Sequence, residues 1–307
     1  MRKIWAVEKV ILAYLAFTVL LMVCFWNRLV DPLLMFLTRG KVLLVMGAMW
    51  ALYCWKPCRL THLLRISGLM ITLSWLYPDT YEVNRVLPNL DHIFAGLEQQ
   101  LFHCQPSLLF SQVCPWGWFS ELMCLVYVSY FPLMVSILLY YFFRRYQEFD
   151  TASYVLISSF FIYYTVFVIL PVTGPQFYYL AVGTGKIANG IFPNVTDYFL
   201  THGERMAAPG WSEGFFYHLL DITHDAGERP TAAFPSSHVG VTTVIMLLAC
   251  HTRSKKLIFS MLPFFVLMCF STVYIYAHYA IDAIAGLVTG VIIYFALWHK
   301  AKKMELR

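Results

Sequence analysis

Apolar residues fall in long runs along this chain, and short polar or charged segments separate the runs. A helix needs about 20 residues to cross the hydrocarbon core of a bilayer, and several runs approach or reach that length. No internal repeat or low-complexity tract interrupts the pattern. It predicts an all-α, polytopic membrane bundle of about eight transmembrane helices, at residues 7–26, 42–56, 63–78, 119–143, 152–171, 237–250, 257–277 and 280–298.

The composition agrees with a membrane protein. Hydrophobic residues make up 60% of the chain, charged residues only 13%, and the mean hydropathy is +0.64, whereas soluble domains average about 25% charged residues. No basic stripe interleaves with exposed aromatic residues, so we expect no nucleic-acid partner. The N-terminal apolar run lacks a small-residue cleavage site, so we expect it to remain as a membrane anchor.

Residues 89–113 mix apolar and polar groups, which indicates an interfacial or re-entrant segment. No linker marks a second soluble domain. The chain therefore divides into an N-terminal part, residues 1–118, with the first helices and this segment, and a membrane core, residues 119–307, with the candidate chemistry.

The Lys and Arg residues near the predicted spans indicate how the chain crosses the membrane. With the N-terminus in the cytoplasm, 15 fall inside: Arg2, Lys3, Lys9, Lys56, Arg59, Arg65, Arg144, Arg145, Arg253, Lys255, Lys256, Lys300, Lys302, Lys303 and Arg307. Seven fall outside: Arg28, Arg39, Lys41, Arg85, Lys186, Arg205 and Arg229. The excess predicts cytoplasmic N- and C-termini. The long loop 172–236 then faces the periplasm or a lumen.

Two of the eight cysteines, Cys104 and Cys114, lie on the predicted outer side, where a disulfide can form. The alternative is a pair of free thiols in an interfacial segment. Most of the other cysteines fall in or beside spans, where cysteine serves as a packing residue.

The most informative residues lie near the C-terminus. A Phe-Pro-Ser-Ser-His segment ends at His238, and His278 and Asp282 follow four residues apart. Forty residues separate the two histidines, apolar except for a basic segment at 251–256. Two helices can therefore run away from His238 and back to His278, which brings both rings to one face of the membrane. Paired imidazoles with a carboxylate beside one of them suit acid–base and nucleophilic chemistry.

These residues resemble the signatures of the type-2 phosphatidic acid phosphatase superfamily. The segment Pro235–His238 resembles its P-S-G-H motif, and Ser271, His278 and Asp282 resemble its S-R-x5-H-x3-D motif. The resemblance covers about residues 150–298. Thr272 replaces the Arg that follows the Ser of that motif.

The superfamily's first motif, K-x6-R-P, has no convincing counterpart. Arg229 and Pro230 are present, but Ile222 stands at the Lys position and the spacing to Pro235 is short. The branch similar to inositol phosphorylceramide synthase and sphingomyelin synthase likewise lacks those cations. Residues 170–178 also resemble the Gly-Pro-rich turn of that branch, which suggests a substrate pocket at Gly174 and Pro175.

The resemblance implies a phosphohistidine intermediate and no metal or other cofactor. His278 is then the candidate nucleophile, and Asp282, at i+4, is expected to accept its other ring N–H. His238 is the candidate general acid, and later the base, for the leaving and incoming oxygens. Ser236, Ser237 and the N–H groups near Gly240 would bind the phosphate at a helix N-terminus.

Simpler explanations exist for several of these residues. His278 and Asp282 could form a structural or metal-binding pair, although no further cysteine or histidine cluster completes a metal site. Ser236 and Ser237 could serve only as N-caps, a role compatible with phosphate binding. Among the outer-loop cations Lys186, Arg205 and Arg229, we expect Arg229 to replace the missing phosphate ligands.

Polar residues gather before the histidine motif. Asp221 and His224 either shape a head-group pocket or lie on a solvated loop helix. Near the starts of two spans, Arg65 and Glu121 are expected to extend toward the interface.

The sequence therefore predicts a membrane lipid phosphoesterase, favouring a phospho-head-group transferase over a lipid phosphate phosphatase. The expected partners are membrane lipids with phosphorylated head groups and a polyol acceptor such as inositol. A non-enzymatic transporter with the same polar residues is the remaining alternative. The lipid, the acceptor and the oligomeric state cannot be read from the sequence.

Overall fold

The computed structural model describes residues 4–305, which form helices and irregular connections with no strand among them. The described α-helices are α1 (Ala6–Cys24), α2 (Pro32–Trp55), α3 (Arg59–Asn84), α4 (Asp91–Phe102), α5 (Pro106–Val113), α6 (Gly117–Val128), α7 (Tyr130–Arg144), α8 (Phe149–Ile169), α9 (Pro175–Val182), α10 (Thr184–Ala188), α11 (Phe215–Gly227), α12 (Ser237–His251), α13 (Lys255–Tyr274) and α14 (Ala280–Glu305). Short 3-10 turns occur at η1 (Trp26–Arg28), η2 (Tyr146–Glu148) and η3 (Tyr198–Leu200). The predicted all-α class is confirmed.

The eight predicted spans all fall on helices, but they do not all qualify as spans. Five helices of the described chain are long and apolar enough: α1, α2, α8, α13 and α14. The pair α6 and α7, bent by 45° at Ser129, is either a sixth, broken span or a re-entrant loop. Helix α12 is apolar but short, and α3 is less apolar. The structure supports an integral membrane protein, and the number eight remains a prediction.

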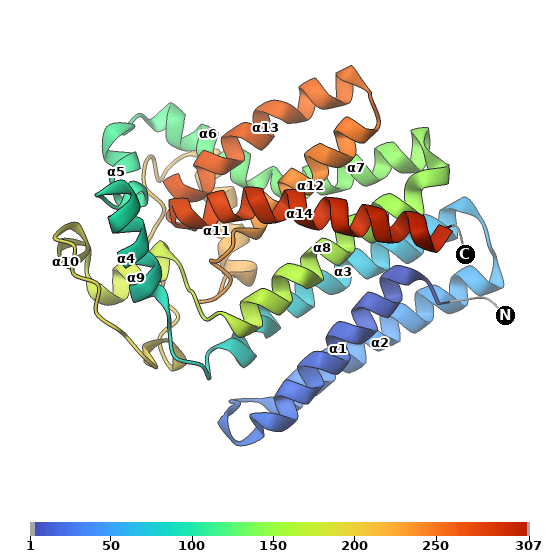
Figure 1. Cartoon of the computed structure of the whole chain (residues 1–307), viewed down its shortest axis with the longest axis horizontal. Coiled ribbons are helices and arrows are strands. Elements are labelled where there is room, and N and C mark those ends of the chain that lie inside the picture. Colours follow the sequence, from blue (N-terminus) through green and yellow to red (C-terminus); the bar gives the residue numbers. More distant parts are fainter. Residues whose placement is uncertain (1–3, 306–307) are drawn as a thin grey trace.

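The centre of the bundle is the contact between α12 and α14, which lie side by side in Figure 1. Glycines permit this close approach. A Cβ at Gly286 would lie 2.5 Å from the Ser236 carbonyl oxygen, and one at Gly290 would lie 2.5 Å from the Gly240 carbonyl oxygen. Small residues that bring helix backbones together are the usual packing device inside membranes.

Two buried ion pairs fasten α1 and α2 to α3. Arg39 on α2 donates to both carboxylate oxygens of Asp79, at 3.0 and 2.8 Å. Arg65 on α3 donates to Glu8 on α1 at 2.7 and 2.6 Å, and its guanidinium lies 3.6 Å from the Trp5 ring centroid.

Three expectations for charged side chains are therefore wrong. Arg39 belongs to a helix that starts at Pro32 and not to an outer loop, and Arg65 is 1% exposed. Glu121 does not extend toward the interface, because it accepts the N–H groups of Phe216 and Tyr217 at 2.9 and 2.8 Å. Long-range partners hold these groups inside, where a lone charge would be costly.

The ends of the described chain lie at the same end of the bundle, opposite α4, α5, α9 and α10 (Figure 1). Most of the Lys and Arg residues that were predicted to be cytoplasmic lie in or beside turns near the chain ends. The Arg145 guanidinium donates to the His251 carbonyl at 3.2 Å, and the His251 ring lies 4.2 Å from the Trp298 ring. Arg2, Lys3 and Arg307 lie outside the described residues. Which compartment each end faces stays a prediction.

The mixed segment 89–113 forms α4 and α5. Cys104 precedes α5 and Cys114 follows it, and both are free thiols. The eight-residue helix between them is about 12 Å long, given a rise of about 1.5 Å per residue. A disulfide needs Cα atoms within about 7 Å. The free-thiol alternative is therefore what the structure shows.

Candidate active site

Helix α12 places His238 in its first turn. The Ser236 hydroxyl caps the helix by accepting the Val239 N–H at 3.3 Å, as predicted for a serine at this position. The His238 ring stacks on Tyr127 at 4.3 Å between centroids and lies 4.5 Å from Tyr130. These two tyrosines come from α6 and α7 on either side of the bend.

His278 lies in the connection between α13 and α14, and its ring meets that of His238. The two ring centroids are 5.9 Å apart, which confirms that the fold brings the two imidazoles together. The His278 Nδ1–H donates to the Ala233 carbonyl at 2.7 Å. Burial lowers the pKa of His278 to about 4. The ring is therefore neutral near pH 7, and its lone pair is on Nε2.

The predicted bond between Asp282 and the His278 ring is not formed. Asp282 Oδ2 lies 3.7 Å from Nδ1 and instead accepts the Tyr279 N–H at 2.9 Å. The i,i+4 argument fails because α14 begins only at Ala280, so His278 precedes the helix. Near a helix N-terminus a carboxylate turns toward unpaired backbone N–H groups. The Ala233 carbonyl occupies the position expected for Asp282.

A buried carboxylate that the sequence analysis missed, Asp91, holds the turn at 171–176. Its Oδ2 accepts from the Asn89 amide at 2.6 Å and from the N–H and hydroxyl of Thr173 at 2.7 and 2.9 Å. Its Oδ1 accepts from the Gly174 N–H at 2.8 Å and the Tyr279 hydroxyl at 3.0 Å. Asp91 is fully buried, which raises its pKa. The sequence pattern indicates residues 89–91 only as part of the mixed apolar and polar segment 89–113.

The turn itself supports the histidine connection. Gly174 has φ +90°, and a Cβ there would lie 2.7 Å from the Ala277 carbonyl oxygen. The Ala233 N–H donates to the Val172 carbonyl at 3.0 Å. Gly174 and Pro175, predicted to line a substrate pocket, are both buried beneath this connection. They position the backbone around His278, and their role in a substrate pocket stays a prediction.

Of the backbone N–H groups expected to bind phosphate, one is already hydrogen-bonded within the helix and two are not. The Gly240 N–H is already bonded to the Ser236 carbonyl at 2.9 Å, and a Cβ at Gly240 would meet the Tyr163 hydroxyl. Gly240 is therefore a packing glycine, and its assignment to phosphate binding is wrong. The N–H groups of Ser237 and His238 have no helical acceptor because they begin the helix.

The hydrogen bonds and ion pairs of Arg229 and Arg205 go to groups other than His238 and His278. Arg229 is exposed and donates to the Glu228 carbonyl at 2.7 Å. Arg205 pairs with Asp221 and Asp225 at 2.8 and 2.9 Å. A role for Arg229 at the phosphate stays a prediction.

Helix α11 carries one polar side chain near the surface and one inside the bundle, and its role in a head-group pocket stays a prediction. Asp221 is half-buried and belongs to the ion pairs with Arg205. His224 points inward, with its ring 5.5 Å from that of Tyr127. Burial, aided by the Arg205 charge, lowers the pKa of His224 to about 3. His224 thus lies behind the same tyrosine that stacks on His238.

Several polar atoms near the imidazoles are enclosed without a protein partner. They are Nδ1 of His238, Nε2 of His224 and the hydroxyl of Thr231. Enclosed polar groups nearly always have a hydrogen-bond partner. Other enclosed atoms without a partner lie elsewhere in the described chain, but a polar ligand beside the imidazoles would supply the missing bonds of these three.

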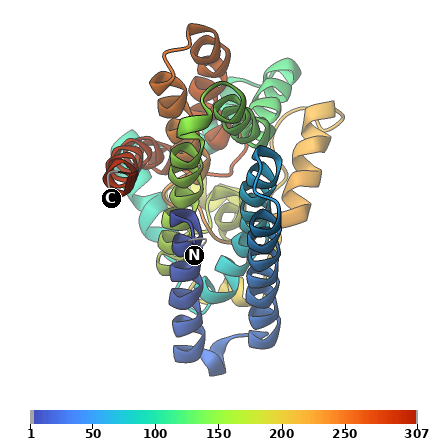
Figure 2. The ribbon, with the colours of Figure 1, turned by 90° about the vertical axis from the view of Figure 1, so that its right-hand side faces the viewer.

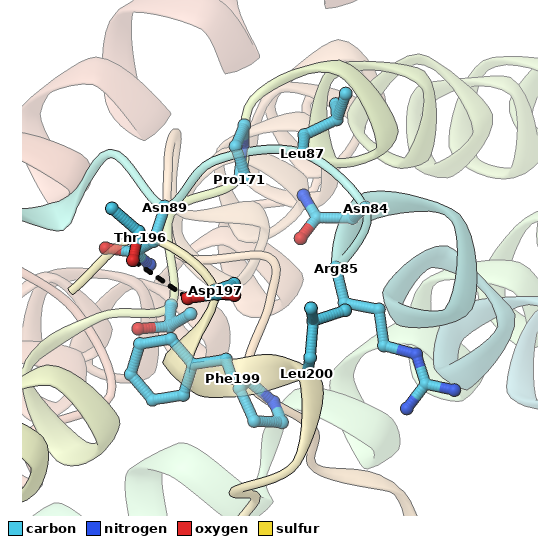
Figure 3. A pocket seen from close by; sticks show the side chains of 11 residues that line it. Asn84, Arg85, Leu87, Asn89, Pro171, Thr196, Asp197, Phe199 and Leu200 are labelled. Carbon is cyan, nitrogen blue, oxygen red and sulfur yellow. Dashed lines mark hydrogen bonds between the residues drawn. The ribbon is translucent and has the colours of Figure 1, made fainter. Parts of the chain in front are cut away.

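A small cavity lies beside the supporting turn and not at the imidazoles (Figure 3). It is lined by residues of 84–89, 171–173 and 196–200 together with Pro230, and Thr196 donates to Asp197 at 2.9 Å within it. Its volume of about 10 Å³ suits about one water. A larger groove of about 280 Å³ lies between α1 and α2. Neither cavity includes His238 or His278.

The comparisons with known proteins point in one direction. A family model described as the PAP2 superfamily matches residues 93–296, about two thirds of the chain. The match includes both histidines and the turn at 171–176. No curated protein and no solved structure matches the chain.

Proposed function

Because the chain belongs to the PAP2 superfamily, we propose that it is an integral membrane enzyme that moves a phosphorylated group from a lipid through a phosphohistidine at His278. A head-group transfer of the inositol phosphorylceramide synthase type is the favoured reaction. Hydrolysis of a lipid phosphate is the alternative. The same intermediate serves both, and only the acceptor differs.

The contact between the two imidazoles carries this proposal. The Ala233 carbonyl fixes the proton of His278 on Nδ1, which leaves Nε2 as the attacking atom. The low pKa of about 4 keeps the ring neutral, as a nucleophile must be. A phosphorus atom in front of Nε2 also lies beside the His238 ring, since the rings are 5.9 Å apart.

His238 is assigned the proton transfer to the leaving oxygen. Tyr127 and Tyr130 hold its ring in place by stacking, so that little reorganisation is needed. The free N–H groups of Ser237 and His238 face the phosphate from the helix N-terminus, where the dipole favours negative charge. A helix terminus thus supplies part of what a Lys or Arg supplies elsewhere in the superfamily.

Two observations favour transfer over hydrolysis. Thr272, which replaces an Arg, is fully buried and donates to the Met268 carbonyl at 3.2 Å, so it makes no contact with a phosphate. Several polar groups of the surrounding segments are neutral or acidic, among them Gln176, His224 and Glu228. Such groups suit an acceptor with hydroxyls better than a bare phosphate dianion.

The test is turnover in purified protein with His278→Ala and His238→Ala. Diacylglycerol release from phosphatidic acid and from phosphatidylinositol would be measured in mixed micelles. We expect His278→Ala to abolish release, and His238→Ala to reduce it by roughly 10²–10⁴-fold, the usual contribution of general acid–base catalysis. Undiminished release from His278→Ala would refute the enzyme proposal and favour the transporter alternative.

A further inference from the structure

Glu228 lies where α11 ends and the chain turns toward His238. Its N–H donates to the His224 carbonyl at 2.7 Å. Its Oε1 accepts from the Gln176 side-chain amide at 3.0 Å. Gln176 is itself fixed, because its N–H donates to the Tyr276 carbonyl at 2.8 Å and its carbonyl accepts from Met206 at 2.8 Å. Through Gln176, the Glu228 carboxylate is therefore linked to the backbone at Tyr276, two residues before His278.

Only one oxygen of this carboxylate has a protein partner in the described chain. Glu228 is half-buried, and its Oε2 is not among the enclosed unpaired atoms. Oε2 is therefore reachable and can accept a hydrogen bond from a ligand.

The other carboxylates of this region differ from Glu228 in their partners or surroundings. Asp282 accepts the Tyr279 N–H through Oδ2 at 2.9 Å, and its Oδ1 is enclosed. Asp91 accepts five hydrogen bonds, and Asp221 and Asp225 pair with Arg205. Glu98 is enclosed and accepts the Ile281 N–H at 3.2 Å.

The charged and titratable groups that face Glu228 come from five parts of the fold. They are His278, Arg205, Arg229, Tyr77 and Tyr127. Burial raises the pKa of Glu228 to about 7, and the neighbouring His278 ring, the Gln176 hydrogen bond and the two arginines limit that rise. A group with a pKa near the working pH exchanges protons most effectively.

The geometry points to Glu228 as the base that binds the acceptor hydroxyl and takes its proton when the phosphohistidine is discharged. This inference rests on the proposed function and adds the acceptor side to it. The hydroxyl oxygen forms a bond to phosphorus while the bond between phosphorus and Nε2 of His278 breaks. The hydroxyl proton passes to Glu228. The electrons of the phosphorus–nitrogen bond return to Nε2, so the positively charged phosphoimidazolium ring becomes a neutral imidazole again, with its proton still on Nδ1.

The assignment also names the class of acceptor. An ionised carboxylate repels a second anion and accepts hydrogen bonds from hydroxyl groups. The acceptor is therefore an alcohol without negative charge next to its reacting hydroxyl. The first half of the reaction, in which His238 protonates the leaving oxygen, does not need Glu228.

The experiment separates the two halves in a single turnover, with protein in excess over labelled phosphatidic acid or phosphatidylinositol and glycerol as the added hydroxyl compound. Diacylglycerol release reports formation of the intermediate, and loss of protein-bound label reports its discharge. For Glu228→Gln we expect release within about twofold of the parent and discharge slower by roughly 10²–10⁴-fold. Discharge in the parent should rise with pH through about 7, and this rise should vanish in the variant.

Glu213→Gln is the matched control, because Glu213 is exposed on the loop before α11. Hydroxylamine needs no base and should discharge the parent and the Glu228→Gln variant equally, while Glu228→Asp should recover part of the rate. Discharge of Glu228→Gln at the parent rate with the same pH profile would overturn the inference alone. A parent that forms no His278-dependent intermediate would overturn the proposed function as well.

If Glu228→Gln does not fold, Gln176→Ala decides the matter. It keeps the carboxylate and removes its anchor, so the same selective slowing of discharge is expected. Discharge at the parent rate would count against the assignment.

Discussion

Replacing Asp91 removes the acceptor around which the turn at 171–176 is built. In Asp91→Ala, two backbone donors, the N–H groups of Thr173 and Gly174, lose their partner in a fully buried place. The hydroxyls of Thr173 and Tyr279 can rotate toward other acceptors, but backbone N–H groups cannot. An orphaned buried donor costs about 1–3 kcal/mol, so the two together cost roughly 2–6 kcal/mol.

Asp91→Asn offers an internal comparison. The amide keeps one oxygen and therefore satisfies only one of the two backbone N–H groups, so the expected loss is about 1–3 kcal/mol. The free energy of unfolding would be measured by titrating SDS into detergent micelles. Turnover would be measured by diacylglycerol release. The turn supports the Ala233 carbonyl that orients His278, so turnover should fall more than the affinity for the lipid.

Asp197→Ala is the control for this series. Asp197 is an exposed carboxylate that lines the small cavity beside the same turn and accepts the Thr196 hydroxyl at 2.9 Å. Its removal should change the free energy of unfolding by no more than about 0.5 kcal/mol. The reasoning would be refuted if Asp91→Ala were as stable and as active as this control.

Three further predictions follow from particular contacts. Glu8→Gln leaves Arg65 buried without its counter-charge and should lower the free energy of unfolding by about 3–5 kcal/mol, as SDS titration would show. The pKa of His278 is about 4 in the folded protein against about 6.5 when unfolded, so its contribution to stability is complete above pH 6.5 and is lost as the pH falls toward 4. A pH series of unfolding should show that slope, and it should shrink in His278→Ala. A cysteine introduced at Glu213 should react with a membrane-impermeant reagent added to the outside of intact membranes. A cysteine introduced at Lys255 should react only after permeabilisation. The reverse pattern would invert the predicted topology.

The meeting of the two histidines could be predicted from the sequence because it rests on length. About forty apolar residues between His238 and His278 leave few options besides an antiparallel helix pair. The N-cap role of Ser236 was predictable for a local reason, since the capping bond spans three residues. Local spacing also misled, because Asp282 was placed at i+4 on a helix that begins only at Ala280.

The remaining features depend on contacts between distant segments, which periodicity does not reveal. Arg39 meets Asp79 across 40 positions, and Asp91 meets Tyr279 across 188. Gly240 looked like a phosphate-loop glycine because it follows the histidine motif, but its reason is the close approach of α14. Glu228 belongs to no sequence motif. It is recognisable only in the structure, where it bonds Gln176, 52 positions away in the sequence, and acts electrostatically on the pKa of His278. The roles of these residues therefore depend on tertiary contacts, which the sequence pattern does not show.

The central claim is covalent chemistry at a single imidazole nitrogen. Its most direct measurement is to mix the protein with phosphatidic acid or phosphatidylinositol labelled at phosphorus, quench in alkali to preserve a nitrogen–phosphorus bond, and map the label by peptide mass spectrometry. The account predicts label on His278 in the parent and none in His278→Ala. Label on another residue, or full turnover with no labelled protein at any time, would contradict it.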